Sequence, residues 1–128
     1  LPDVSVAVAP SVVPESVPVF DIEGAYERLG GDESLLRELV GIFFDDLDRQ
    51  LALLIGSITT GDAAAAENTA HALKGGSSNI GAEEVRQLFY ALEIAGREGR
   101  LDDMKEQYQN LAGPLARLRN ELVARGYL

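Results

Sequence analysis

The sequence predicts an all-α protein, an antiparallel four-helix bundle with a short additional helix on its N-terminal side. Three observations support this prediction. Apolar residues recur at intervals of three and four along most of residues 20–128, which is the period of an amphipathic helix. No segment shows the strict alternation of a half-buried strand. Short breaks that contain Gly or Asp separate the periodic stretches, so neighbouring helices are expected to pack antiparallel.

Residues 1–19 are predicted to be a flexible linker or tail, and residues 20–128 a single bundle domain. Val, Ala, Ser and Pro dominate the first stretch, which has little charge and no basic start of a secretory signal. The chain begins with Leu rather than Met and ends at Leu128, just past the last predicted helix. We therefore expect it to be the C-terminal module of a longer protein rather than a protein that stands alone.

The first two helices have local start and stop signals. Asp21 is placed to cap a short helix that Gly30 and Gly31 would end. Asp32 then begins a longer helix, which Gly61 ends. The apolar positions of this longer helix form one core-facing stripe: Leu36, Leu39, Val40, Phe43, Leu47, Leu51, Leu54 and Ile58.

The third helix is expected to begin at Ala63, after the capping residue Asp62, and to turn at residues 79–81. Its inward stripe consists mostly of small residues, which let a neighbouring helix come close: Ala63, Ala66, Ala70, Leu73, Ser77 and Ile80. His71, the only histidine of the chain, follows the stripe residue Ala70 and is rotated by about 100° from it. We therefore expect His71 at the surface.

Two further helices complete the predicted bundle. The fourth places Val85, Leu88, Leu92 and Ala95 inward and ends near Gly99. The spacing of three and four in the last helix continues through Gly113 and Pro114, at Leu101, Met104, Tyr108, Leu111, Leu115, Leu118 and Leu122. Because an interior proline removes one backbone hydrogen bond, we expect a kink there, within one bent helix rather than two.

The composition excludes several classes of protein. A net charge of -10 argues against a nucleic-acid partner, which would need clustered Lys and Arg. With no cysteine and one histidine, the chain has neither a disulfide framework nor the usual ligand set of a zinc site. No apolar run is long enough to cross a bilayer. These features predict a cytoplasmic protein without metal ligands, without direct membrane contact and most simply a monomer.

His71 is predicted to carry a phosphoryl group. An imidazole nitrogen is a competent nucleophile toward an acyl phosphate, and the product is itself a good phosphoryl donor. Lys74 lies one turn away, where its charge could pair with a phosphoryl oxygen. Gly75 and Gly76 are costly inside a helix, so we interpret them as room for another backbone or a bulky group to approach the ring.

Residues 71–75, together with Ser78 and Gly81, resemble the signature of histidine-containing phosphotransfer (HPt) domains of bacterial multistep phosphorelays. The resemblance extends over roughly residues 20–125. It implies a four-helix bundle in which His71 accepts a phosphoryl group from the aspartate of one response-regulator receiver domain and passes it to another. It also implies an origin in a hybrid sensor histidine kinase, where the domain would be tethered to a membrane sensor.

The resemblance further implies roles for the residues around His71. Lys74 would match the basic residue beside the phosphate, and Gly75 and Ser78 small residues that allow close approach of the receiver. Where the family often has Gln on the following helix, this sequence has Glu93, whose negative charge would repel a phosphoryl group. Arg97 could offset that charge in an ion pair. Further residues expected on the same receiver-facing side are Phe89 and Arg86.

Other functions are weighed against this one. The Gly-rich run lacks the Gly-Lys-Ser/Thr ending of a nucleotide-binding loop and follows no strand, so the protein is expected to be no kinase of its own. No cofactor is expected, and Mg²⁺ only on the partner receiver. A hydrolase built on Ser77 or Ser78 fails because neither serine can reach His71. The alternative that stays open is a helical interaction module without phosphotransfer.

Overall fold

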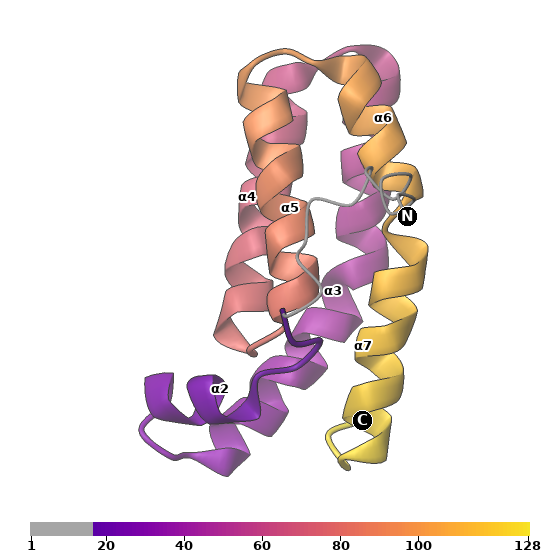
Figure 1. Cartoon of the computed structure of the whole chain (residues 1–128). Coiled ribbons are helices and arrows are strands. Elements are labelled where there is room, and N and C mark those ends of the chain that lie inside the picture. The colour runs from indigo at the N-terminus through magenta and orange to yellow at the C-terminus, as the bar shows by residue number, and fades with distance from the viewer. Residues whose placement is uncertain (1–16) are drawn as a thin grey trace, which may run out of the picture.

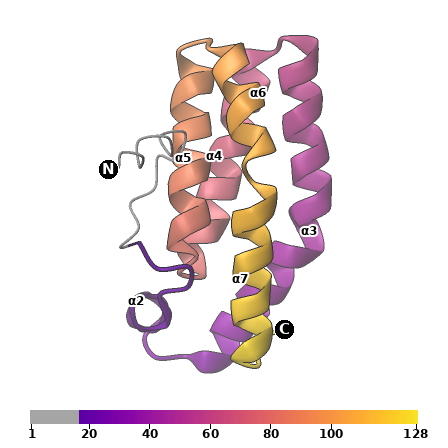
Figure 2. The same ribbon diagram turned by 45° about the vertical axis from the view of Figure 1, so that its right-hand side comes forward.

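The computed structural model describes residues 17–128, and this part of the chain is helical without any strand. The helices are α2 (Ile22–Arg28), α3 (Glu33–Thr60), α4 (Ala63–Asn79), α5 (Glu83–Arg97), α6 (Leu101–Gln109) and α7 (Ala112–Ala124). Three long helices and the consecutive pair α6 and α7 stand side by side as an antiparallel bundle, and α2 lies across one end (Figures 1 and 2). The predicted all-α bundle with a short first helix is confirmed.

The predicted linker over residues 1–19 lies outside the described residues as far as residue 16, so it stays a prediction. Its last residues contact the bundle. The carbonyl of Pro18 accepts a hydrogen bond from the backbone N–H of Glu84 at 3.1 Å. Val19 packs against the core, and Phe20 is buried.

Aspartates begin α2, α3 and α4 where the sequence predicts. In each case a carboxylate oxygen accepts a hydrogen bond from a backbone N–H three residues on, at 3.0, 3.0 and 3.1 Å for Asp21, Asp32 and Asp62. Such caps satisfy N–H groups that have no partner within the helix. Gly61 ends α3 with a φ of 81°, in the left-handed region that favours glycine. The short loop between α3 and α4 follows from these two signals.

The inward stripe of α4 is buried almost as predicted. Ala66, Ala70, Leu73 and Ser77 are buried, whereas Ala63 is only half-buried at the first turn. The Ser77 hydroxyl donates to the carbonyl of Leu73 at 2.8 Å, so this buried polar group has a partner. Small side chains on α4 allow its neighbours to approach, and α4 makes its most extensive contacts with α5.

The short helix α2 is held by polar contacts against the end of the bundle that is lowest in Figure 1. The backbone N–H of Asp21 donates to the carbonyl of Gly81 at 2.7 Å, and Arg28 donates to the carbonyl of Ser78 at 2.7 Å. Position 81 requires glycine, because its φ is +74° and a Cβ there would lie 2.4 Å from the carbonyl oxygen of Asp21. These contacts fix the end of α4.

The last segment differs from the prediction of one bent helix. It forms two helices, because α6 ends at Gln109 and α7 begins at Ala112. Pro114 has no N–H to donate to the carbonyl of Asn110, so a continuous helix would lose a bond and meet a steric clash there. In the structure Pro114 instead occupies the first turn of α7, where an N–H is not needed. The apolar register survives the break, since Leu111, Leu118 and Leu122 are buried.

Gly96 determines how closely α4 and α5 approach each other. A Cβ at this position would lie 3.1 Å from the backbone N and Cα of Glu67 on α4. Contacts that short force a backbone to move rather than a flexible side chain. The glycine therefore lets the main chains of α4 and α5 come together beside His71 and Glu93.

We expect Gly96→Ala to lower the free energy of unfolding by about 1–2 kcal/mol, although alanine favours a helix, because overpacking outweighs propensity. The matched control is Gly56→Ala in α3, where a Cβ meets nothing within 4 Å. That change should raise the free energy of unfolding by up to about 1 kcal/mol. Urea unfolding of both variants measures the difference. Equal effects of the two substitutions would contradict the close contact at Gly96.

Candidate functional site

His71 lies on the exposed side of α4, as its position in the sequence predicts. The His71 side chain is 66% exposed, and its Nδ1 lies 3.0 Å from Oε2 of Glu93 on α5. The ring is therefore anchored at one nitrogen and open to solvent elsewhere. This combination holds the orientation of the imidazole while leaving it accessible to another molecule.

Glu93 is the buried centre of the site. Its side chain is only 5% exposed, and three groups surround the carboxylate. Besides His71, Arg97 Nη2 lies 3.1 Å from Oε2 and Lys74 Nζ lies 2.8 Å from Oε1. The lysine contact is an ion pair, so Oε1 also has a counter-charge. A buried carboxylate is tolerated here because cations compensate it.

The charge state of Glu93 fixes the proton on His71. Burial raises the pKa of Glu93, but the Lys74 ammonium and the His71 ring outweigh it, and the pKa ends below its ordinary value. An ionised carboxylate can only accept hydrogen bonds, so Nδ1 of His71 carries the hydrogen in the 3.0 Å contact. In the neutral imidazole this leaves the lone pair on Nε2.

Arg97 and Lys74 hold Glu93 in different ways. Arg97 contacts two carboxylates at once, because its Nε also lies 3.1 Å from Oε2 of Glu67 on α4. The Lys74 ammonium has one carboxylate partner, and it lies 5.0 Å from the centre of the Tyr90 ring. Arginine is therefore the fixed cation of the site, and lysine the one with fewer anchors.

The two glycines that follow Lys74 have different surroundings. A Cβ at Gly75 would meet nothing within 4 Å, so this position is open beside His71. A Cβ at Gly76 would lie 3.2 Å from the Phe43 ring of α3. The interpretation of both glycines as room for an approaching molecule is thus wrong for Gly76, whose space serves the packing of α3 on α4.

The expectation that Phe89 faces a partner is wrong. Phe89 is fully buried, with 0% exposure. It lies four residues before Glu93 and therefore shares the side of α5 that turns into the bundle. The aromatic residue at the surface is its neighbour Tyr90, which is 47% exposed and which the sequence analysis missed. A rotation of about 100° per residue separates the two positions.

Arg86 and Ser78 lie outside the cluster around Glu93. Arg86 is bound to Glu83, with 2.9 Å between Nε and Oε1, and it is two helical turns from Glu93. Ser78 is two turns from His71 at the end of α4, where its carbonyl accepts the bond from Arg28. Neither the Arg86 guanidinium nor Ser78 is positioned to contact the His71 ring.

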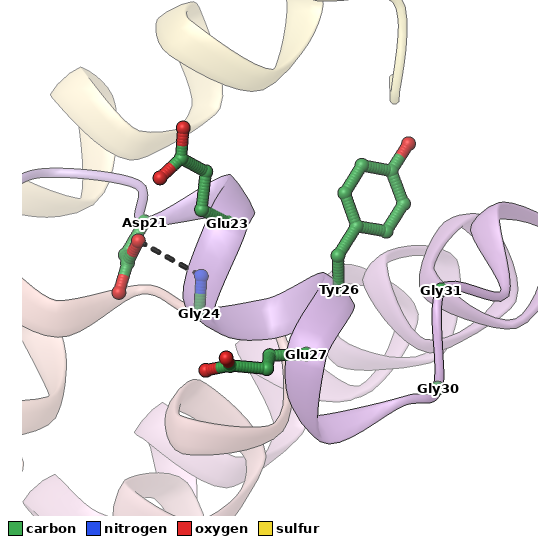
Figure 3. Close-up of a pocket in the computed structure, with 7 residues that line it drawn as sticks. All are labelled: Asp21, Glu23, Gly24, Tyr26, Glu27, Gly30 and Gly31. Atoms are coloured by element: carbon green, nitrogen blue, oxygen red, sulfur yellow. Dashed lines mark hydrogen bonds between the residues drawn. The ribbon is translucent and has the colours of Figure 1, made fainter.

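A separate groove lies beside α2, with a volume of about 750 Å³ (Figure 3). Asp21, Glu23 and Glu27 line it, but among residues 17–128 no group of three or more His, Cys, Asp or Glu side chains could hold a metal ion. Asp21 is already occupied as the cap of α2 through Gly24 (Figure 3). His71 therefore stays the candidate site. No helix among the described residues is long and apolar enough to span a membrane.

The lowered pKa of Glu93 predicts a loss of stability in acid. A carboxylate with a lowered folded pKa contributes stability above its ordinary pKa of 4.5, and this contribution is lost as the pH falls through the lowered value. In Glu93→Gln this part of the pH dependence should disappear. Urea unfolding between about pH 3 and pH 6 measures it. The control is Glu121→Gln, which removes an exposed pair with Arg125 and should keep the wild-type profile. Parallel profiles for wild type and Glu93→Gln would contradict the assignment.

Comparison with known proteins identifies the family of this chain. Residues 38–122 match the Hpt domain family. The solved structure of histidine-containing phosphotransfer protein B (HptB) from Pseudomonas aeruginosa PAO1 is similar, with 28% sequence identity and a TM-score of 0.76 over 86% of this chain and 96% of that one. No curated protein matches. Hpt proteins are phosphotransfer intermediates rather than kinases, and they interact with receiver domains of response regulators. The chain thus belongs to the Hpt domain family and is a phosphoryl carrier of a two-component phosphorelay.

Proposed function

We propose that His71 is the phosphoryl acceptor of this carrier and that Nε2 is the reacting atom. The observation that supports this most directly is the 3.0 Å contact of Nδ1 with Glu93 on a ring that is 66% exposed. It leaves Nε2 with the lone pair and with access to a partner. No other side chain among the described residues combines a nucleophilic nitrogen of this kind with such an anchor.

The reaction is the transfer of a phosphoryl group from a receiver aspartate. The lone pair of Nε2 forms the bond to phosphorus, the bond between phosphorus and the aspartate oxygen breaks, and its electron pair stays on the aspartate as a carboxylate. The ring keeps its hydrogen on Nδ1 and becomes positively charged. Glu93 stabilises that developing charge through the contact already present. The reverse steps pass the group to a second receiver.

The position of Glu93 removes the conflict expected between an acid and a phosphoryl group. Glu93 contacts the Nδ1 side of the ring, whereas the phosphoryl group would sit on Nε2. Lys74 and Arg97 compensate the carboxylate charge. Glu93 therefore orients the imidazole and stabilises its positive charge, whereas an amide at this position could only orient it.

We also propose the oligomeric state, the metal requirement and the location in which this protein exchanges phosphoryl groups with receivers. The chain would act as a monomer without its own kinase activity, and Mg²⁺ would be bound by the receiver. It would meet receivers in the cytoplasm, without nucleic-acid or membrane contact, in keeping with a net charge of -10 that repels phosphate backbones. One exposed histidine per bundle is sufficient for this chemistry, which supports a monomer.

Phosphorylation of a receiver followed by mixing with this protein tests the acceptor. We expect label on wild type that is lost in acid and stable in alkali, and none on His71→Gln, because the amide has no nucleophilic nitrogen. Intact mass measured before and after acid treatment reports the label. Glu93→Gln should retain labelling at a lower rate. Label that persists on His71→Gln would overturn the assignment.

The open surface at Gly75 predicts that a large side chain there slows phosphoryl transfer without lowering the free energy of unfolding. In Gly75→Leu the side chain extends into empty space, so the free energy of unfolding should not fall, but the leucine should obstruct the approach of a receiver to His71. The control is Gly56→Leu in α3, where the surroundings are equally open. Stopped-flow transfer rates and urea unfolding are compared for both. An unchanged transfer rate in Gly75→Leu would show that the receiver does not cover this position.

A further inference from the structure

Phosphorylation of His71 would add negative charge beside a cluster that already contains the carboxylate of Glu93. In the resting protein Lys74 is paired with the buried Glu93, at 2.8 Å. A phosphoryl group on Nε2 carries about two negative charges. It would lie within reach of the same lysine, which is one helical turn from His71. Lys74 would then face two anions, and the more highly charged phosphoryl group would compete with Glu93 for its ammonium.

Lys74 is the cation free to move. Its one carboxylate contact is with Oε1 of Glu93, its other neighbour is the Tyr90 ring at 5.0 Å, and its charge lies at the end of a flexible four-carbon stem. Arg97 has more partners than Lys74, because it contacts Glu93 on its own helix and Glu67 on α4 at once. The guanidinium is thus fixed between two carboxylates on neighbouring helices, on the Nδ1 side of His71.

Departure of Lys74 is tolerated only if Glu93 keeps another cation. The carboxylate is 5% exposed, and a buried charge without compensation is strongly destabilising. Arg97 remains on Oε2, the same oxygen that accepts the Nδ1 hydrogen of His71. The ring itself becomes positive on phosphorylation, which adds a second counter-charge to Glu93.

We propose that Lys74 transfers from Glu93 to the phosphoryl group when His71 is phosphorylated, and that Arg97 is the positioning residue that makes this exchange possible. Without Arg97, Lys74 stays on Glu93 and the phosphoryl group lacks its cation. This inference rests on the proposed phosphorylation of His71. It assigns to Arg97 an effect on the transfer step that acts through Glu93, with no contact to the receiver or to the phosphoryl group.

A double-mutant cycle tests the dependence on Glu93. The rate of transfer from a phosphorylated receiver is measured at saturating receiver for wild type, Arg97→Gln, Glu93→Gln and the double variant. Arg97→Gln should slow transfer about tenfold in the wild-type background, the value of one charge-assisted hydrogen bond. In the Glu93→Gln background its effect should be less than about twofold, because Lys74 is then released without help.

Other variants separate positioning from docking. Arg97→Lys should restore the greater part of the rate, since a lysine can still pair with Glu93. Glu67→Gln, which loosens the second anchor of Arg97, should cause a smaller loss of the same sign. The matched control is Arg100→Gln, which removes an arginine bound to Glu98 and Asp103 but not to Glu93, and should leave the rate unchanged. The receiver concentration for half-maximal rate should be unaltered throughout.

The outcomes distinguish the two proposals. If wild type takes no label on His71, the proposed acceptor and this inference both fail. If wild type is labelled but Arg97→Gln has no effect, or the same effect with and without Glu93, the inference alone is overturned. A raised half-saturating concentration for Arg97→Gln would instead place the arginine in contact with the receiver, and would also overturn it. Circular dichroism of each variant verifies that the bundle is folded.

Discussion

The buried carboxylate of Glu93 is the constraint on which the site depends. It sits between α4 and α5, where an uncompensated charge would destabilise the bundle, and His71, Lys74 and Arg97 each contact it. The same carboxylate determines which ring nitrogen of His71 is free. Folding and the proposed transfer at His71 thus rely on one set of contacts, because the interactions that make the acid tolerable are those that orient the imidazole and hold its neighbouring cations.

Most of the fold was predictable because its signals are local. Asp21, Asp32 and Asp62 cap helices through side chains that reach only three residues along the chain. The break between α6 and α7 was not predicted, although Pro114 was recognised as a disruption. Apolar spacing reports which face of a helix is buried, and that face continues across the break; it does not report whether the backbone hydrogen bonds are continuous.

The site was predictable in part. The surface position of His71 follows from its rotation away from the small residues of α4. The family resemblance indicated Glu93 and its ion pair with Arg97, but as a charge that repels the phosphoryl group and not as a partner of the ring. The burial of Glu93, the lysine contact and the exposure of Tyr90 in place of Phe89 depend on the distance and rotation between α4 and α5. Those quantities arise from packing between residues far apart in the sequence, and no periodicity within one helix contains them.

Gly96 gives the geometry of the site a foundation in the main chain. Since a Cβ at Gly96 would lie 3.1 Å from the backbone of Glu67, main-chain contact as well as side-chain packing sets the spacing of α4 and α5 near Glu93. A carboxylate and an amide of the same shape can therefore exchange at that position without displacing the helix that carries the histidine. Part of the alignment of the two helices thus comes from the main chain, so single substitutions at position 93 can adjust the charge beside the imidazole while that part is kept.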